Sequence, residues 1–268
     1  MEPEQDQPPP IVDVNFTLQI GKGQLQASAQ VPSGNVNLGA LLPILHGLSS
    51  AIIDATVNQV REEGFAISCK AGCGACCRQL VPLSMFEADQ LAAWIRSLPP
   101  TQQAVIEARF DAAIARLKES GMLDRLDFEG GSQPGSKEER QLALDYMHAG
   151  VPCPFLENES CGIHPIRPAV CREYLVTSPA QFCASPTAQT VKPVRIPLKL
   201  STALNKLGGA VTSVQRGWIP LVFLYGWLRS GRDVSSAYQG PGPELLRVVF
   251  EQLETPSEAA PDEHPAQA

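Results

Sequence analysis

Eight cysteines are the residues whose type and spacing in this chain most clearly indicate chemistry. Four of them fall within one short string, CKAGCGACCR, as Cys69, Cys73, Cys76 and Cys77. Gathered thiolates repel one another and lose hydration, so a cation is needed to make the assembly favourable. The first cysteine group therefore predicts a centre containing zinc or iron, with a 4Fe-4S cluster as one form that it can take.

The adjacent pair Cys76 and Cys77 restricts the kind of centre. Neighbouring side chains diverge from the backbone, so both rarely bind one tetrahedral ion. Either one of the two is not a ligand, or the centre is polynuclear or double. Gly72 and Gly74 allow the backbone to curl around such a centre.

The second cysteine group is more widely spaced: Cys153, Cys161, Cys171 and Cys183. It lies in residues 150–187, where Pro, Gly and Cys are dense, and this composition favours a loop folded around a ligand. Neither group has the paired CxxC arrangement of a zinc ribbon. Four plus four cysteines permit two tetrahedral sites. For Cys183 a ligand and a buried unreactive thiol both stay open.

Two strings together, CKAGCGACCR and CPFLENESCGIHPIRPAVCREY, resemble the YkgJ-like CxxCxxCC family, a domain described as zinc- or iron-chelating. The similarity runs from Cys69 to Tyr174 with a helical insertion between the strings, and the first spacing here is CxxxC rather than CxxC. The resemblance implies a metal-binding domain. A structural zinc site needs four ligands and no more, so the surplus of cysteines favours a centre that takes part in chemistry. Flagellin lysine N-methylases resemble the same domain, so protein lysine N-methylation is a minor alternative.

Charged and aromatic residues beside the cysteines are candidates for binding the centre or its ligand: Arg78, Arg167, Arg172 and Tyr174. A guanidinium group can balance thiolate charge or hold a carboxylate substrate. Tyr174, together with Phe155, is expected to close the site from water. His164 is open between a nitrogen ligand and a packing residue.

Hydrophobic periodicity predicts a mainly α fold with a small β element, in which helices surround a cysteine-rich metal-binding core. Alternating apolar residues predict a β-hairpin over residues 11–31. Helices are predicted at Asn37–Glu63, Ser84–Leu98, Thr101–Glu119, Ser136–His148, Leu198–Val211, Trp218–Arg229 and Glu244–Glu254. Capping boxes begin two of them, at Ser84 with Glu87 and at Ser136 with Glu139. We expect one domain over residues 37–254, with disorder at 1–10 and 255–268.

The length and composition of the chain limit the functional classes to which the protein can belong. A chain of 268 residues can bury a core without disulfide staples. The N-terminus lacks the features of a secretory signal and no apolar stretch is expected to span a membrane, so we expect a cytoplasmic protein with reduced thiols. The net charge of −7 argues against nucleic acid as the main partner.

A basic stretch offers a second candidate binding feature. No Asp or Glu occurs between Tyr174 and Arg232, where the cations are Lys192, Arg195, Lys199, Lys206, Arg216, Arg229 and Arg232. The stretch is a solvated face, a set of cations that balance thiolates, or a surface for an anionic small molecule or an unknown protein partner. Two functional hypotheses follow. In the first, the metal centre takes part in chemistry. In the second, the protein is a binding module whose metal either stabilises the fold or is stored and delivered.

Overall fold

The computed structural model describes residues 9–21, 23–126, 136–187, 189–212, 216–234 and 236–254. Most of the two tails that the sequence predicts to be disordered therefore lies outside the described residues, as does most of the polar loop before residue 136. At the described N-terminal end, the Pro10 carbonyl accepts a hydrogen bond from the Ser33 amide at 2.7 Å.

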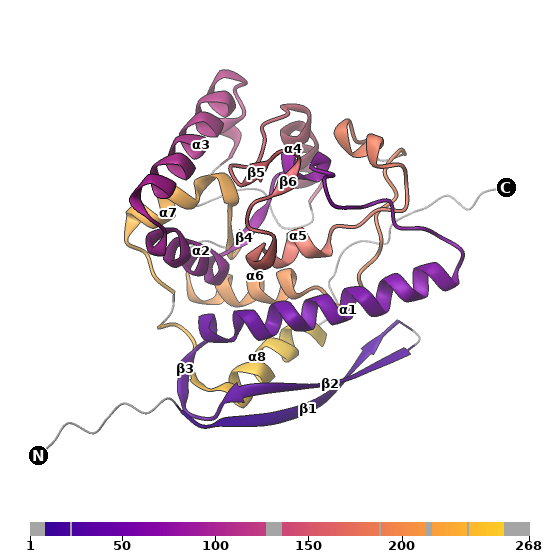
Figure 1. Ribbon diagram of the computed structural model, residues 1–268, viewed down its shortest axis with the longest axis vertical. Coiled ribbons are helices and arrows are strands. Elements are labelled where there is room, and N and C mark those ends of the chain that lie inside the picture. The colour runs from indigo at the N-terminus through magenta and orange to yellow at the C-terminus, as the bar shows by residue number, and fades with distance from the viewer. Residues whose placement is uncertain are drawn as a thin grey trace, which may run out of the picture.

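The N-terminal hairpin is formed by β1 (Ile11–Ile20) and β2 (Gly23–Pro32), which pair antiparallel along their whole length. Gly21 supplies the positive φ of the turn, at 56°. The apolar face of the hairpin packs on α1 (Leu42–Glu62), where Leu18 and Ile20 join a buried cluster with Ile52. Figure 1 shows the hairpin on one side of α1, beside α8 (Gly242–Glu254). The predicted hairpin is confirmed.

The long helix α1 follows the short 3-10 helix η1 (Leu38–Leu41), which Asn37 caps by accepting a hydrogen bond from the Ala40 amide. The combined segment Leu38–Glu62 is long and apolar enough to cross a membrane by length and composition, with a mean hydropathy of 1.5 in its most apolar window. This corrects the expectation that no apolar stretch reaches that length. Half of that window is buried inside the protein, and such burial is typical of a core helix.

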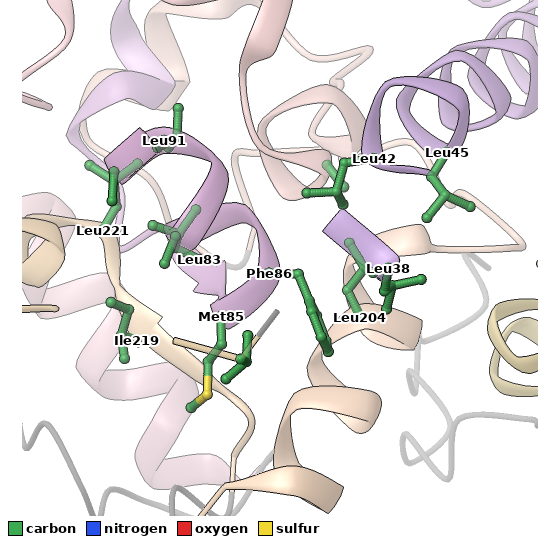
Figure 2. Close-up of a cluster of buried hydrophobic side chains, with 14 of the residues drawn as sticks. Leu38, Leu42, Leu45, Leu83, Met85, Phe86, Leu91, Leu204, Ile219 and Leu221 are labelled. Atoms are coloured by element: carbon green, nitrogen blue, oxygen red, sulfur yellow. The ribbon is translucent and has the colours of Figure 1, made fainter. Parts of the chain in front are cut away.

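The main core lies on the other side of α1, where α2 (Met85–Ser97) and α6 (Leu200–Val211) pack against it. Figure 2 shows Leu42, Phe86 and Leu204 projecting from these three helices into one apolar layer. The outer helices are α3 (Pro100–Glu119), α4 (Lys137–His148) and α7 (Leu224–Ser230). The mainly α fold with a small β element is therefore confirmed.

The predicted helix at 218–229 is wrong in its first part. Residues of β7 (Trp218–Pro220) pair antiparallel with β4 (Pro82–Ser84), and the chain becomes helical only in η6 (Leu221–Phe223) and α7. Pro220 has no amide hydrogen to donate and biases the residue before it toward an extended conformation. A second short pair joins β3 (Asn35–Asn37) to β8 (Gln239–Pro241).

Candidate metal centre

The first cysteine group forms a tight loop after α1. Gly64 ends the helix with a φ of 87°, and the Ser68 amide then donates to the Val176 carbonyl at 3.0 Å. Gly72 turns the chain with a φ of 79°. The 3-10 helix η2 (Ala75–Arg78) follows and carries the adjacent pair Cys76 and Cys77. Of the two glycines in the predicted curl, Gly72 therefore has a conformation that favours glycine, whereas Gly74 has a φ of −88° that other residues adopt.

The second group begins on a small hairpin that docks on the first loop. The strands β5 (Leu156–Glu157) and β6 (Ser160–Cys161) are joined by a two-residue turn in which Asn158 and Glu159 have positive φ values of 48° and 58°. The Cys153 amide donates to the Cys77 carbonyl at 2.7 Å, so the two cysteine groups are joined through the backbone.

The last two cysteines lie on short helical segments. Cys171 is in α5 (Ala169–Glu173), and Cys183 is in the 3-10 helix η5 (Ala180–Ala184), which lies against η2. Figure 1 shows β5, β6 and α5 on the face of α1 opposite to the N-terminal hairpin. The helices α1 and α2 thus form a base for loops that carry the thiols.

A cavity of about 100 Å³ lies between these segments. Thiols from both cysteine groups line it: Cys69, Cys73, Cys76, Cys171 and Cys183. Lys70, Arg167 and Tyr174 also line it. All eight cysteines are free thiols. Residues far apart in the sequence thus meet at one thiol-rich cavity.

Burial dominates the protonation of these thiols. Desolvation raises the pKa of Cys153 to about 12 and that of Cys183 to about 11, and it raises the pKa of Cys171 well above its ordinary value. The pair in η2 behaves differently: a hydrogen bond from Cys77 lowers the pKa of Cys76 to about 7, while the same bond raises the pKa of Cys77. Metal binding to this set therefore requires proton release, which a cation can drive.

The charges that act on each thiol place the cysteines around two neighbouring positions, and the charge of Cys76 acts on thiols at both. Around the cavity, the thiolate charges of Cys69, Cys76 and Cys73 raise the pKa of Cys183. We call these four the cavity set. Around the β5–β6 hairpin, the charges of Cys153 and Cys161 raise the pKa of Cys77, and both also act on Cys171. We call these last four the hairpin set.

Soft thiolate donors suit zinc and iron, so the chemistry of this donor set fits the predicted metals. Within the part of the chain that the structure describes, no three side chains of His, Cys, Asp or Glu form a group ready to hold a metal ion. Five of the thiols therefore line one cavity without forming a coordination shell. The cysteines are carried on loops and on short elements of five residues or fewer.

The residues that line the cavity lie within a segment that matches a known family. Residues 68–189 match the model of the CxxCxxCC family, described as "Putative zinc- or iron-chelating domain". This segment is similar to the CxxCxxCC family. It includes all eight cysteines and ends just after η5. No curated protein and no solved structure matches the chain. Metal chelation is therefore the function that the family match supports.

The residues predicted to support the candidate site lie in different places. Tyr174 lines the cavity, and burial raises its pKa to about 12, so its phenol stays protonated. Phe155 instead lies in the apolar core, where its ring packs edge-on against Phe110 with centroids 5.5 Å apart. The nearby charges that lower the pKa of the exposed His164 come from Arg167 and Arg172. The expectation that Phe155 closes the cavity is not met, because the cavity lining does not include it.

Gly74 permits the β5–β6 hairpin to approach the first cysteine loop. A β-carbon at this position would lie 2.5 Å from Glu159 Oε2 and 2.9 Å from Leu156 Cδ1. The sequence indicated a need for backbone flexibility at Gly74. It contained no pattern that predicted the close approach of the β5–β6 hairpin.

Replacing Gly74 by Ala is therefore expected to displace the hairpin and lower both metal content and stability, by about 1–3 kcal/mol. Equilibrium urea unfolding and elemental analysis check this. The matched control is Gly47→Ala, an exposed position in α1 with nothing near its β-carbon, which should stabilise the protein by about 0.5–1 kcal/mol. Equal metal content and stability in Gly74→Ala and wild type would contradict the role of the close approach.

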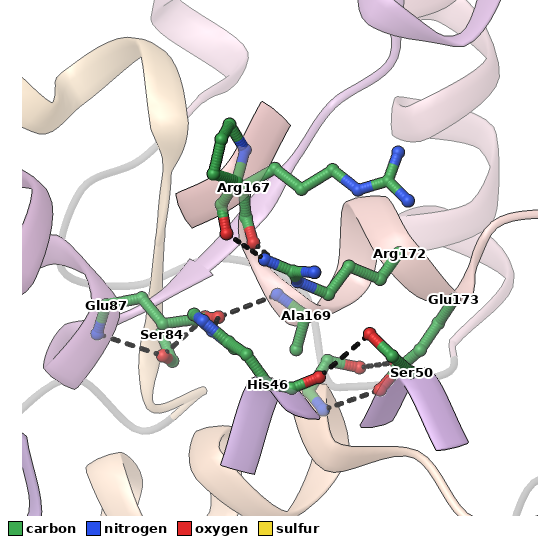
Figure 3. A network of polar contacts seen from close by, with 10 residues as sticks. His46, Ser50, Ser84, Glu87, Arg167, Ala169, Arg172 and Glu173 are labelled. Atoms are coloured by element: carbon green, nitrogen blue, oxygen red, sulfur yellow. Dashed lines mark hydrogen bonds and ion pairs between the residues drawn. The ribbon is translucent and has the colours of Figure 1, made fainter. Parts of the chain in front are cut away.

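A network of buried polar contacts stabilises both ends of α5 (Figure 3). Glu87 accepts hydrogen bonds from the Ser84 hydroxyl and the Ala169 amide, both at 2.7 Å, and lies 3.1 Å from His46 Nε2. At the other end of α5, Glu173 accepts hydrogen bonds from the amide and hydroxyl of Ser201. The N-cap predicted at Ser84 is confirmed by the bond from the Glu87 amide to Ser84 Oγ, whereas the Glu87 carboxylate accepts from the Ser84 hydroxyl. No local sequence pattern indicated that the Glu87 carboxylate would contact residues of both α1 and α5.

Replacing Glu87 by Ala should destabilise the protein by about 3 kcal/mol, because the Ala169 amide and the side chains of Ser84 and His46 lose a buried partner. Urea unfolding measures the loss, and Glu87→Gln, which keeps one acceptor oxygen, should lose less. A change below about 0.5 kcal/mol in Glu87→Ala would show that the network does not support α5.

Proposed function

We propose that the protein binds zinc or iron through its cysteines at two adjacent thiolate sites, and that it acts through this centre. The observation that carries the proposal is the cavity lined by thiols from both cysteine groups. The cavity set and the hairpin set would hold the metal, with Cys76 and Cys77 adjacent at their junction. When bound, zinc would supply Lewis acidity and an iron–sulfur cluster would supply electron transfer.

The chain's own residues give the centre its shape and protection. Arg78 pairs with Glu159 across the two cysteine segments, with an Nη2–Oε1 distance of 2.7 Å, and its Nη1 donates to the Gly74 carbonyl at 2.9 Å. Arg172 donates to the carbonyls of Arg167 and Pro165 and so fixes the turn that leads into α5. These contacts support a centre whose walls are held in place by hydrogen bonds outside the thiols.

Purification under anaerobic conditions followed by metal and acid-labile sulfide analysis tests the proposal. We expect zinc or iron to copurify with the chain. A folded wild type with all thiols reduced and no bound metal would overturn it. A single zinc whose removal changes stability alone would favour the alternative of a structural-zinc or metal-handling module.

A further inference from the structure

The three arginines beside the cysteines differ in what their guanidinium groups contact. Those of Arg78 and Arg172 donate to Glu159 and to backbone carbonyls. The Arg167 Nε is buried and, among the residues that the structure describes, has no hydrogen-bond partner. In Figure 3 the Arg172 guanidinium folds back on the Arg167 backbone, whereas the Arg167 side chain extends away from the network. A buried donor without a partner costs free energy, and a ligand is one way to satisfy it.

The surroundings of Arg167 indicate which kind of ligand could satisfy its buried Nε donor. Arg167 and Lys70 line the cysteine cavity, and no Asp or Glu among the residues that the structure describes lines it. No ion pair is formed by either cation within the described ranges. One cavity wall also runs beside the basic stretch, since Val176, which lines the cavity, forms an antiparallel bridge with Pro193. The cavity thus offers two cations without a carboxylate partner.

We propose that this cavity binds a small oxyanion, a carboxylate or phosphate group, with Arg167 as its anchor and Lys70 at its side. A guanidinium group presents parallel N–H donors that match two oxygens of such a group. The Tyr174 phenol lines the same cavity and can donate a further hydrogen bond. A cavity of about 100 Å³ suits a group of the size of acetate or phosphate rather than a large ligand. The inference rests on the proposed function, because the same cavity holds the cavity set of thiols.

The rival role for Arg167 is to balance thiolate charge. Its positive charge lowers the pKa of the Cys69, Cys76 and Cys161 thiols, so it lies near all three. Under that role Arg167 serves metal binding and no added anion binds. The two roles therefore differ in whether a substitution changes anion affinity or metal content.

Isothermal titration of the anaerobically purified protein with sodium acetate, and separately with sodium phosphate, tests the proposal. The metal content of each sample is measured first, and the titration is carried out whatever that content is. We expect saturable binding of at least one of the two anions at one site per chain. Arg167→Gln should weaken it at least about tenfold and leave metal content unchanged, and Arg167→Lys should weaken it less.

Arg125→Gln is the matched control, since Arg125 pairs with Asp145 and does not line the cavity, and it should keep the affinity of the wild type. Wild type that binds neither anion saturably, or Arg167→Gln that binds as wild type does, would overturn the proposal. Loss of metal in Arg167→Gln without anion binding by wild type would assign charge balance instead. If the wild type contains no metal, the proposed function fails, yet the titration still decides the oxyanion site.

Discussion

Replacing Cys171 by Ser is expected to remove bound metal and lower the free energy of unfolding by about 3 kcal/mol or more. Cys171 lines the cavity, and the thiolate charges that raise its pKa come from Cys153, Cys161 and Cys76. It is thus near members of both thiol sets. Because a metal site is not formed in the unfolded chain, the free energy of metal binding contributes directly to folding. Elemental analysis and urea unfolding measure the two effects.

The matched control is the same comparison in the presence of a chelator. Without metal, the buried serine hydroxyl still costs about 1–3 kcal/mol, so the stabilities of wild type and Cys171→Ser should differ less with chelator than without it. A stability difference that is equal with and without chelator would show that Cys171 acts through packing alone. Normal metal content in Cys171→Ser would contradict its assignment as a ligand.

The sequence could predict the elements whose signals are local. The alternation from Val12 to Val31 specified the register of the N-terminal hairpin, because a one-residue slip would place the apolar face in water. The predicted N-caps Ser84 and Ser136 both accept the expected amide hydrogen bond. In each case a few consecutive residues contain the whole physical signal.

Elements that depend on distant partners could not be predicted in the same way. The strand β7 is three residues long, too short to show alternation, and it exists because β4, far away in the chain, supplies its hydrogen bonds. The role of Glu87 likewise depends on His46 and on the Ala169 amide, which are distant in sequence. Apolar content alone indicated a helix at Trp218, because a buried strand and a buried helix share that composition.

The candidate site was predictable in its residue types but not in its arrangement. Cysteine density pointed to a metal, yet nothing in the spacing showed that η5 would lie against η2 and bring Cys183 to the cavity. The three arginines also looked equivalent in sequence. Only the structure distinguishes Arg167, which lines the cavity, from Arg78 and Arg172, whose guanidinium groups are bound elsewhere.

Separate substitutions of Cys76 and Cys77 are expected to reduce metal content to different extents. Cys77 belongs to the hairpin set, with Cys153 and Cys161 as further neighbours. The charge of Cys76 acts on thiols of both sets, including Cys183 and Cys171. Two adjacent sites would therefore meet at this pair, which one tetrahedral ion could not easily use in full.

Elemental and sulfide analysis of anaerobically purified variants measures this difference. Wild type should contain two metal ions per chain, or iron with acid-labile sulfide in a polynuclear centre. Under the two-site arrangement, Cys77→Ser should lose about half of the metal, since the cavity set keeps its thiols. Cys76→Ser should lose more, because its thiol neighbours both sets. One colourless zinc per chain, with Cys77→Ser equal to wild type in metal content and melting temperature, would show instead that a single ion uses only part of the cysteines.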